Sequence, residues 1–262
     1  MTLRSPVLNV MVSAARKASK ALVRDFGEIE LLQVSEKGTS DFLATADFRT
    51  ETTLRKELAR ARPDFGFLFD KARNQIGKDP NTRWIIAPID GATNFLHGIP
   101  HFAISIALEK QGEILASIIY NPVQDELYFS EKGQGAFLND RRLRVSARNR
   151  LSDALIATGC PQNERIQHSI YLDQLGVVME SSHSVRSMGS ISLDLAYVAA
   201  GRVEAFWDIS LETQQVAAGV LLIREAGGFV TEIDGGSDPI NTGNILATNS
   251  RLYQPMVELF HN

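Results

Sequence analysis

The chain has 262 residues, of which 44% are hydrophobic, and its formal net charge is −4. This length and apolar content predict a buried core in one large α/β domain or two small ones. The weak negative charge, without a long run of like charges, argues against direct binding to the phosphate backbone of nucleic acid. No apolar run approaches the ~20 residues of a membrane helix, and no secretory signal is recognisable. We therefore expect a cytoplasmic protein without a membrane partner.

The first part of the chain begins with two helical patterns. Ser5-Pro6 is a helix-start signal, and apolar residues then recur at near-helical spacing until Gly27. A second amphipathic helix is predicted over residues 45–62, and Pro63 is expected to end it. Both helices therefore precede any strand pattern.

From Arg83 onward the pattern changes to short apolar runs separated by turn residues. The turns contain glycine, asparagine and proline, which is typical of an antiparallel meander. The predicted strands are Trp84–Ile89, Phe102–Leu108, Ile114–Tyr120 and Leu127–Ser130.

The second half alternates strand and helix patterns. The predicted order is strand 154–158, helix 190–200, strand 203–208, helix 215–226, strand 229–233 and a last helix after Asn249. An α+β half (residues 1–148) would thus precede an α/β half (residues 149–262) in one compact structural unit. The fold class expected is a layered α+β and α/β architecture, with helices packed between and over two β-sheets.

Cysteine and histidine give no strong sign of a metal site. Cys160 is the single cysteine, so it cannot form an internal disulfide, and we expect a buried structural thiol. His97 and His101 are four residues apart and could suggest a metal pair, but no acidic residue accompanies them. A packed or hydrogen-bonding role is favoured for both.

The segment Trp84-Ile-Ile-Ala-Pro-Ile-Asp-Gly-Ala-Thr-Asn-Phe-Leu-His-Gly98 is the most specific motif of the chain. It resembles the signature W-I-I/V-D-P-I/L-D-G-T-T-N-F-x-H-G of the inositol monophosphatase family. Further segments match family motifs in the same order, at residues 41–47, 66–71, 188–196 and 216–228. The resemblance spans nearly the whole chain and implies the inositol monophosphatase-like sugar-phosphatase fold.

The resemblance also implies a Mg²⁺-dependent phosphomonoesterase scaffold, in which carboxylates hold two metal ions and a metal-bound water attacks phosphorus. It places metal ligands at Asp70, Asp90 and the backbone carbonyl of Ile89. Two further ligand positions have lost their carboxylate. Ala87 stands where the family has its bridging aspartate, and Gln215 stands where it has an aspartate of the second metal. Asp70 itself replaces a glutamate.

The remaining site residues are also assigned by resemblance. Asp47 would orient the attacking water together with a threonine, but that threonine position is Ala92, which leaves Asp47 as a catalytic remnant. Gly91 and Thr93 keep donors for a phosphate at the start of a helix, where an anion is favoured. The other residues placed at the phosphate or substrate are Gly189, Ser190 and Asp208.

Two functional hypotheses follow from this comparison. In the first, the protein is a degenerate family member that is catalytically impaired or inactive, and its Mg²⁺ binding is weak or absent. It would act as a homodimer that weakly binds a small phosphorylated polyol, phosphate or sulfate, or that binds an unidentified protein partner. In the second, it is an active Mg²⁺-dependent phosphatase for inositol-1-phosphate or a related sugar phosphate, with Asp70, Asp90 and recruited waters compensating. The missing carboxylates favour the first hypothesis.

Overall fold

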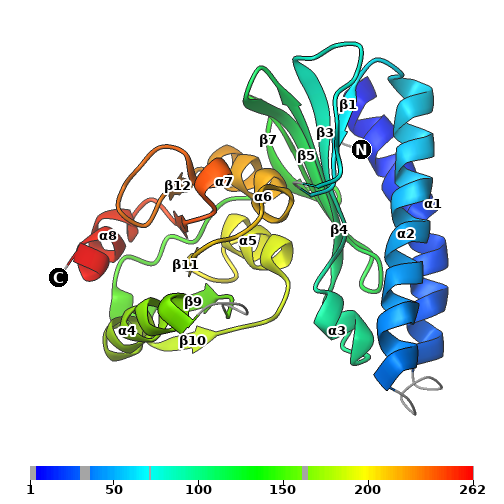
Figure 1. The fold of residues 1–262 in the computed structure, drawn as a ribbon. Helices are drawn as coiled ribbons and strands as arrows, with labels where there is room; N and C mark the ends of the chain where they lie inside the picture. Colours follow the sequence, from blue (N-terminus) through cyan, green and yellow to red (C-terminus); the bar gives the residue numbers. More distant parts are fainter. Residues whose placement is uncertain (1–3, 30–35, 71, 161–164, 262) are drawn as a thin grey trace.

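The computed structural model describes residues 4–29, 36–70, 72–160 and 165–261, which form alternating layers of helix and sheet. An outer pair of helices, α1 and α2, covers one face of a large sheet (Figure 1). Helices α5 and α6 lie between this sheet and a smaller one, and α4 and α8 cover the far face of the smaller sheet. The layered fold class predicted from the sequence is confirmed.

Helix α1 (Pro6–Glu28) begins as its sequence predicts. The Ser5 side chain accepts a hydrogen bond of 3.3 Å from the backbone N–H of Leu8, and Pro6 occupies the first turn. A serine cap satisfies one of the free donors at a helix start, and proline there loses no hydrogen bond. The buried face of α1 packs towards the large sheet.

Helix α2 (Glu36–Ala61) starts earlier than predicted, because the expected helix began at residue 45. Its first turns are polar and carry no apolar periodicity, so sequence pattern alone did not show them. The two helices are joined by a buried carboxylate, Asp25, whose oxygen lies 2.9 Å from the Arg49 guanidinium. The end of α2 agrees with the proline at position 63.

The large sheet has eight strands in the order β2-β1-β3-β4-β5-β6-β7-β8. From β3 to β8 every neighbouring pair is antiparallel, which confirms the predicted meander, whereas β1 pairs with β3 in parallel. The short strands β1, β2, β7 and β8 were not predicted. The strands are β1 (Gly66–Leu68), β2 (Asn74–Gln75), β3 (Thr82–Asp90), β4 (Ala103–Lys110), β5 (Glu113–Asn121), β6 (Glu126–Glu131), β7 (Gly135–Leu138) and β8 (Arg141–Arg142).

The smaller sheet has five strands in the order β10-β9-β11-β13-β12. The strands are β9 (Leu155–Thr158), β10 (Ser184–Arg186), β11 (Ala205–Asp208), β12 (Phe229–Thr231) and β13 (Ile245–Thr248). The helices are α3 (Ala92–Leu96), α4 (Arg165–Ser181), α5 (Ile191–Ala199), α6 (Thr213–Glu225), α7 (Pro239–Thr242) and α8 (Tyr253–His261), with a 3₁₀ turn at Leu151–Asp153. Of the elements after residue 148, the strands β10 and β13, the helices α4 and α7 and the 3₁₀ turn were not predicted, whereas the others were. Helix α3 follows Gly91, where the family resemblance implies a helix start.

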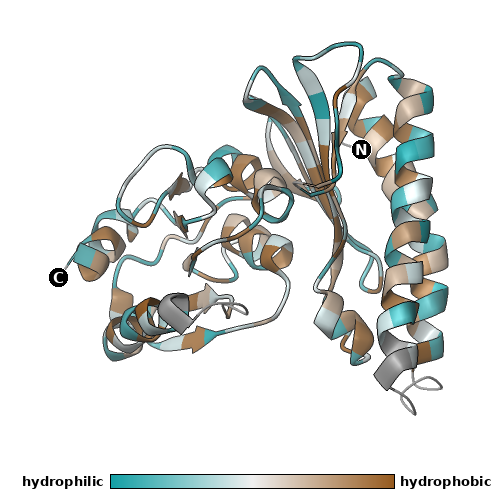
Figure 2. Ribbon diagram, in the orientation of Figure 1, coloured by the Kyte–Doolittle hydropathy of each residue, from teal (hydrophilic) through white to brown (hydrophobic). Residues whose placement is uncertain are grey.

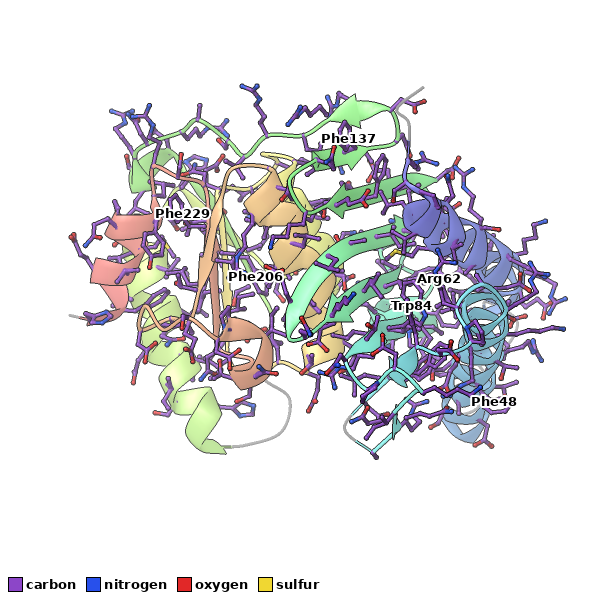
Figure 3. The ribbon with its side chains drawn as sticks, turned by 90° about the horizontal axis from the view of Figure 1, so that it is seen from above. Phe48, Arg62, Trp84, Phe137, Phe206 and Phe229 are labelled. Atoms are coloured by element: carbon purple, nitrogen blue, oxygen red, sulfur yellow. The ribbon has the colours of Figure 1, made fainter. Side chains whose placement is uncertain are left out.

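Three hydrophobic cores hold the layers together. Trp84 is buried between the large sheet and the α1–α2 pair, and Phe206 is buried between the sheets against the α5–α6 layer. Trp207 lies in the third core, beneath α4 and α8. Figure 2 shows hydrophobic residues along the strands and on the central helices, and Figure 3 shows Trp84 and Phe206 in separate parts of the interior.

The two sheets come from successive parts of the chain, residues 66–142 and residues 155–248. The predicted division at residue 148 falls between them and stays a prediction. Arg148 contacts the second part there, because its guanidinium lies 2.8 Å from the buried carboxylate of Glu204. Within the ranges listed above, no helix is long and apolar enough to cross a membrane.

Candidate functional site

The turn after β3 fixes the backbone of the candidate site. The pairing of β3 with β4 is irregular between Ala87 and Asp90, and Gly91 follows with a φ of 91° before α3 begins. A Cβ atom at Gly91 would lie 2.9 Å from the carbonyl oxygen of His101. Only glycine combines this φ with so close a backbone approach, so the motif residue is required by the shape of the turn.

A cavity of about 750 Å³ lies beside this turn. Its lining includes every site residue assigned from the sequence except Ser190. The assigned residues that line it are Asp47, Asp70, Ala87, Ile89, Asp90, Gly91, Ala92, Thr93, Gly189, Asp208 and Gln215. The fold thus brings together positions from both predicted halves of the chain, although their roles remain predictions.

Asp90 is buried and held from behind by the start of α5. Its Oδ2 accepts hydrogen bonds from the Ser190 hydroxyl at 2.6 Å and from the Ser192 backbone N–H at 2.8 Å. Burial raises the pKa of Asp90, and these two hydrogen bonds oppose the shift. Ser190 therefore supports the carboxylate in this structure, and its assigned contact with substrate stays a prediction.

The cavity that Asp90 lines also contains Arg73, whose guanidinium lies among three carboxylates. The Arg73 Nε donates to Asp70 Oδ2 at 2.5 Å, and Nη1 lies 3.6 Å from Asp47 Oδ2. Nη1 also donates to the Glu51 carboxylate. Sequence analysis missed both Arg73 and Glu51. The one available signal was that Glu51 lies one helical turn after Asp47, on the same face of α2.

The pKa values of the two assigned carboxylates in this cluster move in opposite directions. Burial raises the pKa of Asp47, and the nearby Arg73 opposes the shift. Burial acts upward on Asp70 as well, but its hydrogen bonds from Arg73 prevail and lower its pKa. Asp70 is therefore a stably ionised partner of the guanidinium.

Gln215 is engaged in starting helix α6. Its Oε1 accepts a hydrogen bond of 2.9 Å from the backbone N–H of Glu212, while the Glu212 side chain accepts from the backbone at position 215. This reciprocal arrangement is a capping box. The one oxygen that Gln215 could offer a cation is thus already an acceptor within the helix start.

These residues do not fit the two-metal centre implied by the resemblance. Ala87 presents a methyl group, Gln215 is engaged in capping, and both oxygens of Asp70 accept hydrogen bonds from Arg73, at 2.7 Å from its N–H and 2.5 Å from Nε. Among the described residues, no three histidine, cysteine or acidic side chains are arranged to hold a metal ion. Mg²⁺ requires several hard oxygen ligands in near-octahedral geometry, and this donor set lacks them.

Asp208 reaches the cavity from the end of β11, in the other sheet. Its Oδ1 accepts a hydrogen bond of 2.8 Å from the Ile209 backbone N–H, and a Cβ atom at Gly159 would lie 1.9 Å from Oδ2. Glycine at position 159 therefore makes room for the carboxylate. Burial raises the pKa of Asp208 to about 6. The group can accept or donate hydrogen bonds near neutral pH, which suits contact with the hydroxyl groups of a ligand.

A further acid, Asp194 on α5, was missed by the sequence analysis. It is fully buried, and neither carboxylate oxygen has a hydrogen-bond partner among the residues the structure describes. Burial raises its pKa well above the usual value, and the charges of Asp90 and Asp208 add to the effect. Folding therefore favours the protonated, uncharged form of the Asp194 carboxyl.

Replacing Asp194 with asparagine is expected to stabilise the protein at pH 7 by at least about 1 kcal/mol, because the uncharged amide avoids the proton uptake that the buried carboxyl needs on folding. The unfolded carboxyl is ionised above its ordinary pKa of 3.8 and must take up a proton on folding. The gain should therefore grow as pH rises above about 4 and vanish below it. Urea unfolding across this pH range measures it.

The exposed Asp173→Asn change on α4 is the matched control and should shift stability by less than about 0.5 kcal/mol. An Asp194→Asn variant that is no more stable than the unaltered protein at pH 7, with no dependence on pH, would contradict the burial argument.

The cysteine and histidine predictions have different outcomes. Cys160 is exposed at the rim of the cavity, so the expectation of a buried thiol is wrong. It directly follows Gly159 where the chain leaves β9, and a residue beyond a strand end need not face the core. The His101 ring packs edge-on against Tyr197, with 5.7 Å between ring centroids, and burial lowers its pKa. Its predicted packing role is confirmed, whereas His97 is exposed.

A sequence model described as the inositol monophosphatase family matches residues 3–262. An inositol-1-monophosphatase of Rhizobium meliloti (strain 1021) is 54% identical over 256 residues, which cover 98% of this chain and 96% of that protein. A Nus factor SuhB of Escherichia coli (strain K12) is 37% identical over 252 residues, covering 96% and 94%. The crystal structure of the extragenic suppressor protein suhB from Bartonella henselae matches with a TM-score of 0.89 and 51% identity, covering 98% of each chain.

Proposed function

Because the chain belongs to the inositol monophosphatase family, we propose that its cavity binds a small phosphorylated polyol on a phosphomonoesterase scaffold whose hydrolytic step is impaired. The observation that carries this proposal is the state of Asp70, both of whose oxygens accept hydrogen bonds from Arg73. With Ala87 and Ala92 beside it, the site lacks a bridging carboxylate and a hydroxyl that could orient water. Reduced Mg²⁺ binding and slow turnover follow from these losses.

Ligand binding is supported by what the cavity retains. Gly91 and Thr93 line one part of it and offer a backbone N–H and a hydroxyl to a phosphate, whereas Asp208 lines another part and can bind hydroxyl groups. The carboxylates in the lining outnumber the described cationic groups there, and like charges repel. We therefore propose weak binding, in which the polyol hydroxyls contribute to recognition along with the phosphate.

The proposal extends to the setting of the protein. We propose a cytoplasmic homodimer, with an unidentified protein partner as a second route to function. The Escherichia coli relative is named a Nus factor, and this name is the one observation that points towards a role other than hydrolysis.

A second candidate is an active Mg²⁺-dependent phosphatase for inositol-1-phosphate or a related sugar phosphate. The name of the Rhizobium meliloti relative, at 54% identity, supports this candidate more directly than the first. Asp70 and Asp90 would then bind Mg²⁺ with recruited waters. Arg73 opposes that arrangement, because its guanidinium competes with a metal ion for the charge and the lone pairs of the Asp70 carboxylate.

Calorimetric titration of the full chain with inositol-1-phosphate separates the two candidates. We expect weak binding of similar strength in EDTA and in millimolar Mg²⁺, because in the first candidate no metal ion contributes to binding of the phosphate. Binding that appears only with Mg²⁺, accompanied by release of phosphate, would instead establish the second candidate. Inorganic phosphate and unphosphorylated inositol serve as matched ligands that show which part of the molecule is recognised.

A further inference from the structure

The Arg73 guanidinium lies among three carboxylates that come from two separate elements. Asp47 and Glu51 project from α2, and Asp70 belongs to the turn that joins β1 to β2. The negative charges of these carboxylates thus favour a cation at the position of the guanidinium. Arginine is suited to such a place because its planar fork donates several hydrogen bonds at once.

The backbone holds Arg73 in this position. Its N–H donates to the carbonyl oxygen of Asp70 at 3.1 Å and to Asp70 Oδ1 at 2.7 Å, while the Phe69 N–H donates to the carbonyl oxygen of Arg73 at 3.3 Å. Pairing of Phe67 with Gln75 closes the β1–β2 hairpin around the turn. The turn and the ion pairs therefore favour the same side-chain direction.

We infer that Arg73 is the resident cation of this cluster and excludes divalent metal ions from Asp47, Glu51 and Asp70. A divalent ion that binds these carboxylates must compete with the guanidinium for their negative charge and lone pairs, and displacing the guanidinium breaks several charge-assisted hydrogen bonds. Without Arg73, Asp47 and Asp70 would lose the guanidinium between them, and a diffusible cation would then be favoured there. Glu51 would keep its ion pair with Arg55 at 3.1 Å. Arg73 thereby determines which cation the site holds.

This inference deepens the proposed function, since both rest on the contact between Arg73 and Asp70, but it concerns the cation alone and is tested without a phosphorylated polyol. A role for Arg73 as the main phosphate ligand is disfavoured by geometry. Its Nε and Nη1 are directed at Asp70 and Glu51, and Asp47 is also near. The surrounding negative charge opposes an approaching anion.

The test is Mn²⁺ binding to the full chain, followed by electron paramagnetic resonance of the free ion. We compare the unaltered protein with Arg73→Gln, which removes the charge, and Arg73→Lys, which keeps a charge but loses the fork. Arg60→Gln is the matched control, because Arg60 pairs with Glu57 on the same helix but outside the cavity. Thermal melts establish that each variant is folded.

Arg73→Gln is expected to bind Mn²⁺ at least about tenfold more tightly than the unaltered protein, a change of the size seen when groups supporting a metal site are altered. Arg73→Lys and Arg60→Gln should resemble the unaltered protein. Saturable, tight Mn²⁺ binding by the unaltered protein would overturn the inference, and this measurement does not depend on any variant folding. A folded Arg73→Gln variant that gains no Mn²⁺ binding would overturn it as well. Both results are independent of inositol-1-phosphate binding.

Discussion

A quintuple variant, with five substitutions, is expected to hydrolyse inositol-1-phosphate in millimolar Mg²⁺ at least about 100-fold faster than the unaltered protein. The changes are Ala87→Asp, Ala92→Thr, Gln215→Asp, Asp70→Glu and Arg73→Gln. The first four restore the carboxylates and the hydroxyl that the family motifs imply. The last removes the guanidinium that engages Asp70 in the structure.

Partial combinations should gain little, because residues that act as one constellation are strongly non-additive. A quadruple variant, which carries the other four substitutions but keeps Arg73, is the informative comparison, since its restored carboxylates would still face the Arg73 guanidinium. Ala87→Asp alone adds a carboxylate next to Asp90 and should raise a carboxyl pKa and lower stability slightly. The Gln215→Asp change loses one half of the capping box, although an acid remains favourable in the first turn of α6.

The measurement is the rate of phosphate release against Mg²⁺ concentration, with thermal melts to confirm folding. Activity in the quintuple variant but not in the quadruple variant would assign the loss of hydrolysis to the missing metal ligands and Arg73 together. A quintuple variant that is folded but stays inactive and metal-free would show that the site has diverged in more than these residues.

Replacing Trp84 with alanine is expected to lower the free energy of unfolding by about 3–5 kcal/mol, the usual cost of truncating a buried tryptophan. Trp84 is fully buried on β3, and its ring packs against Phe65 with 5.7 Å between ring centroids. The indole N–H has no partner among the described residues, so the loss should be one of apolar packing. Because β3 also ends at Asp90, loosening this strand should disturb the cavity.

Urea unfolding measures this effect, and Phe48→Ala is the matched control. Phe48 lies on α2 with 69% of its surface exposed, and Figure 3 shows it at the outer side of the helix. Its truncation should cost less than about 0.5 kcal/mol. Similar losses for both variants would contradict the burial of Trp84.

Much of the fold could be predicted from local signals in the sequence. Ser5-Pro6 marks the start of α1 because its cap is made by neighbouring residues. The meander from β3 to β6 shows as apolar runs between turn residues, since each strand is long enough to display a pattern. The early start of α2 is polar, and the strands β2 and β8 are only two residues long, so none of them shows such a pattern. The two strands are defined by their pairing with the neighbouring strands β1 and β7.

The site residues also fall into two groups, those that could be predicted from the sequence and those that could not. The motif identified Ala87, Ala92 and Asp90 because the turn after β3 is encoded by consecutive residues. Arg73 and Asp194 could not be found, because two of the three carboxylates around Arg73 lie on α2, far away in the sequence, and the burial of Asp194 shows only in the structure. A departure from a family motif can thus be read from consecutive residues, whereas the contacts of Arg73 become visible only in three dimensions.

Metal-dependent hydrolysis is expected to be impaired in the unaltered protein. The most direct measurement is steady-state hydrolysis of inositol-1-phosphate by the full chain over a wide range of Mg²⁺ concentration. Turnover is expected to lie far below about 1 s⁻¹, the lower end of typical enzymes, without saturation by Mg²⁺. Turnover of about 1 s⁻¹ or more that saturates with Mg²⁺ would contradict it.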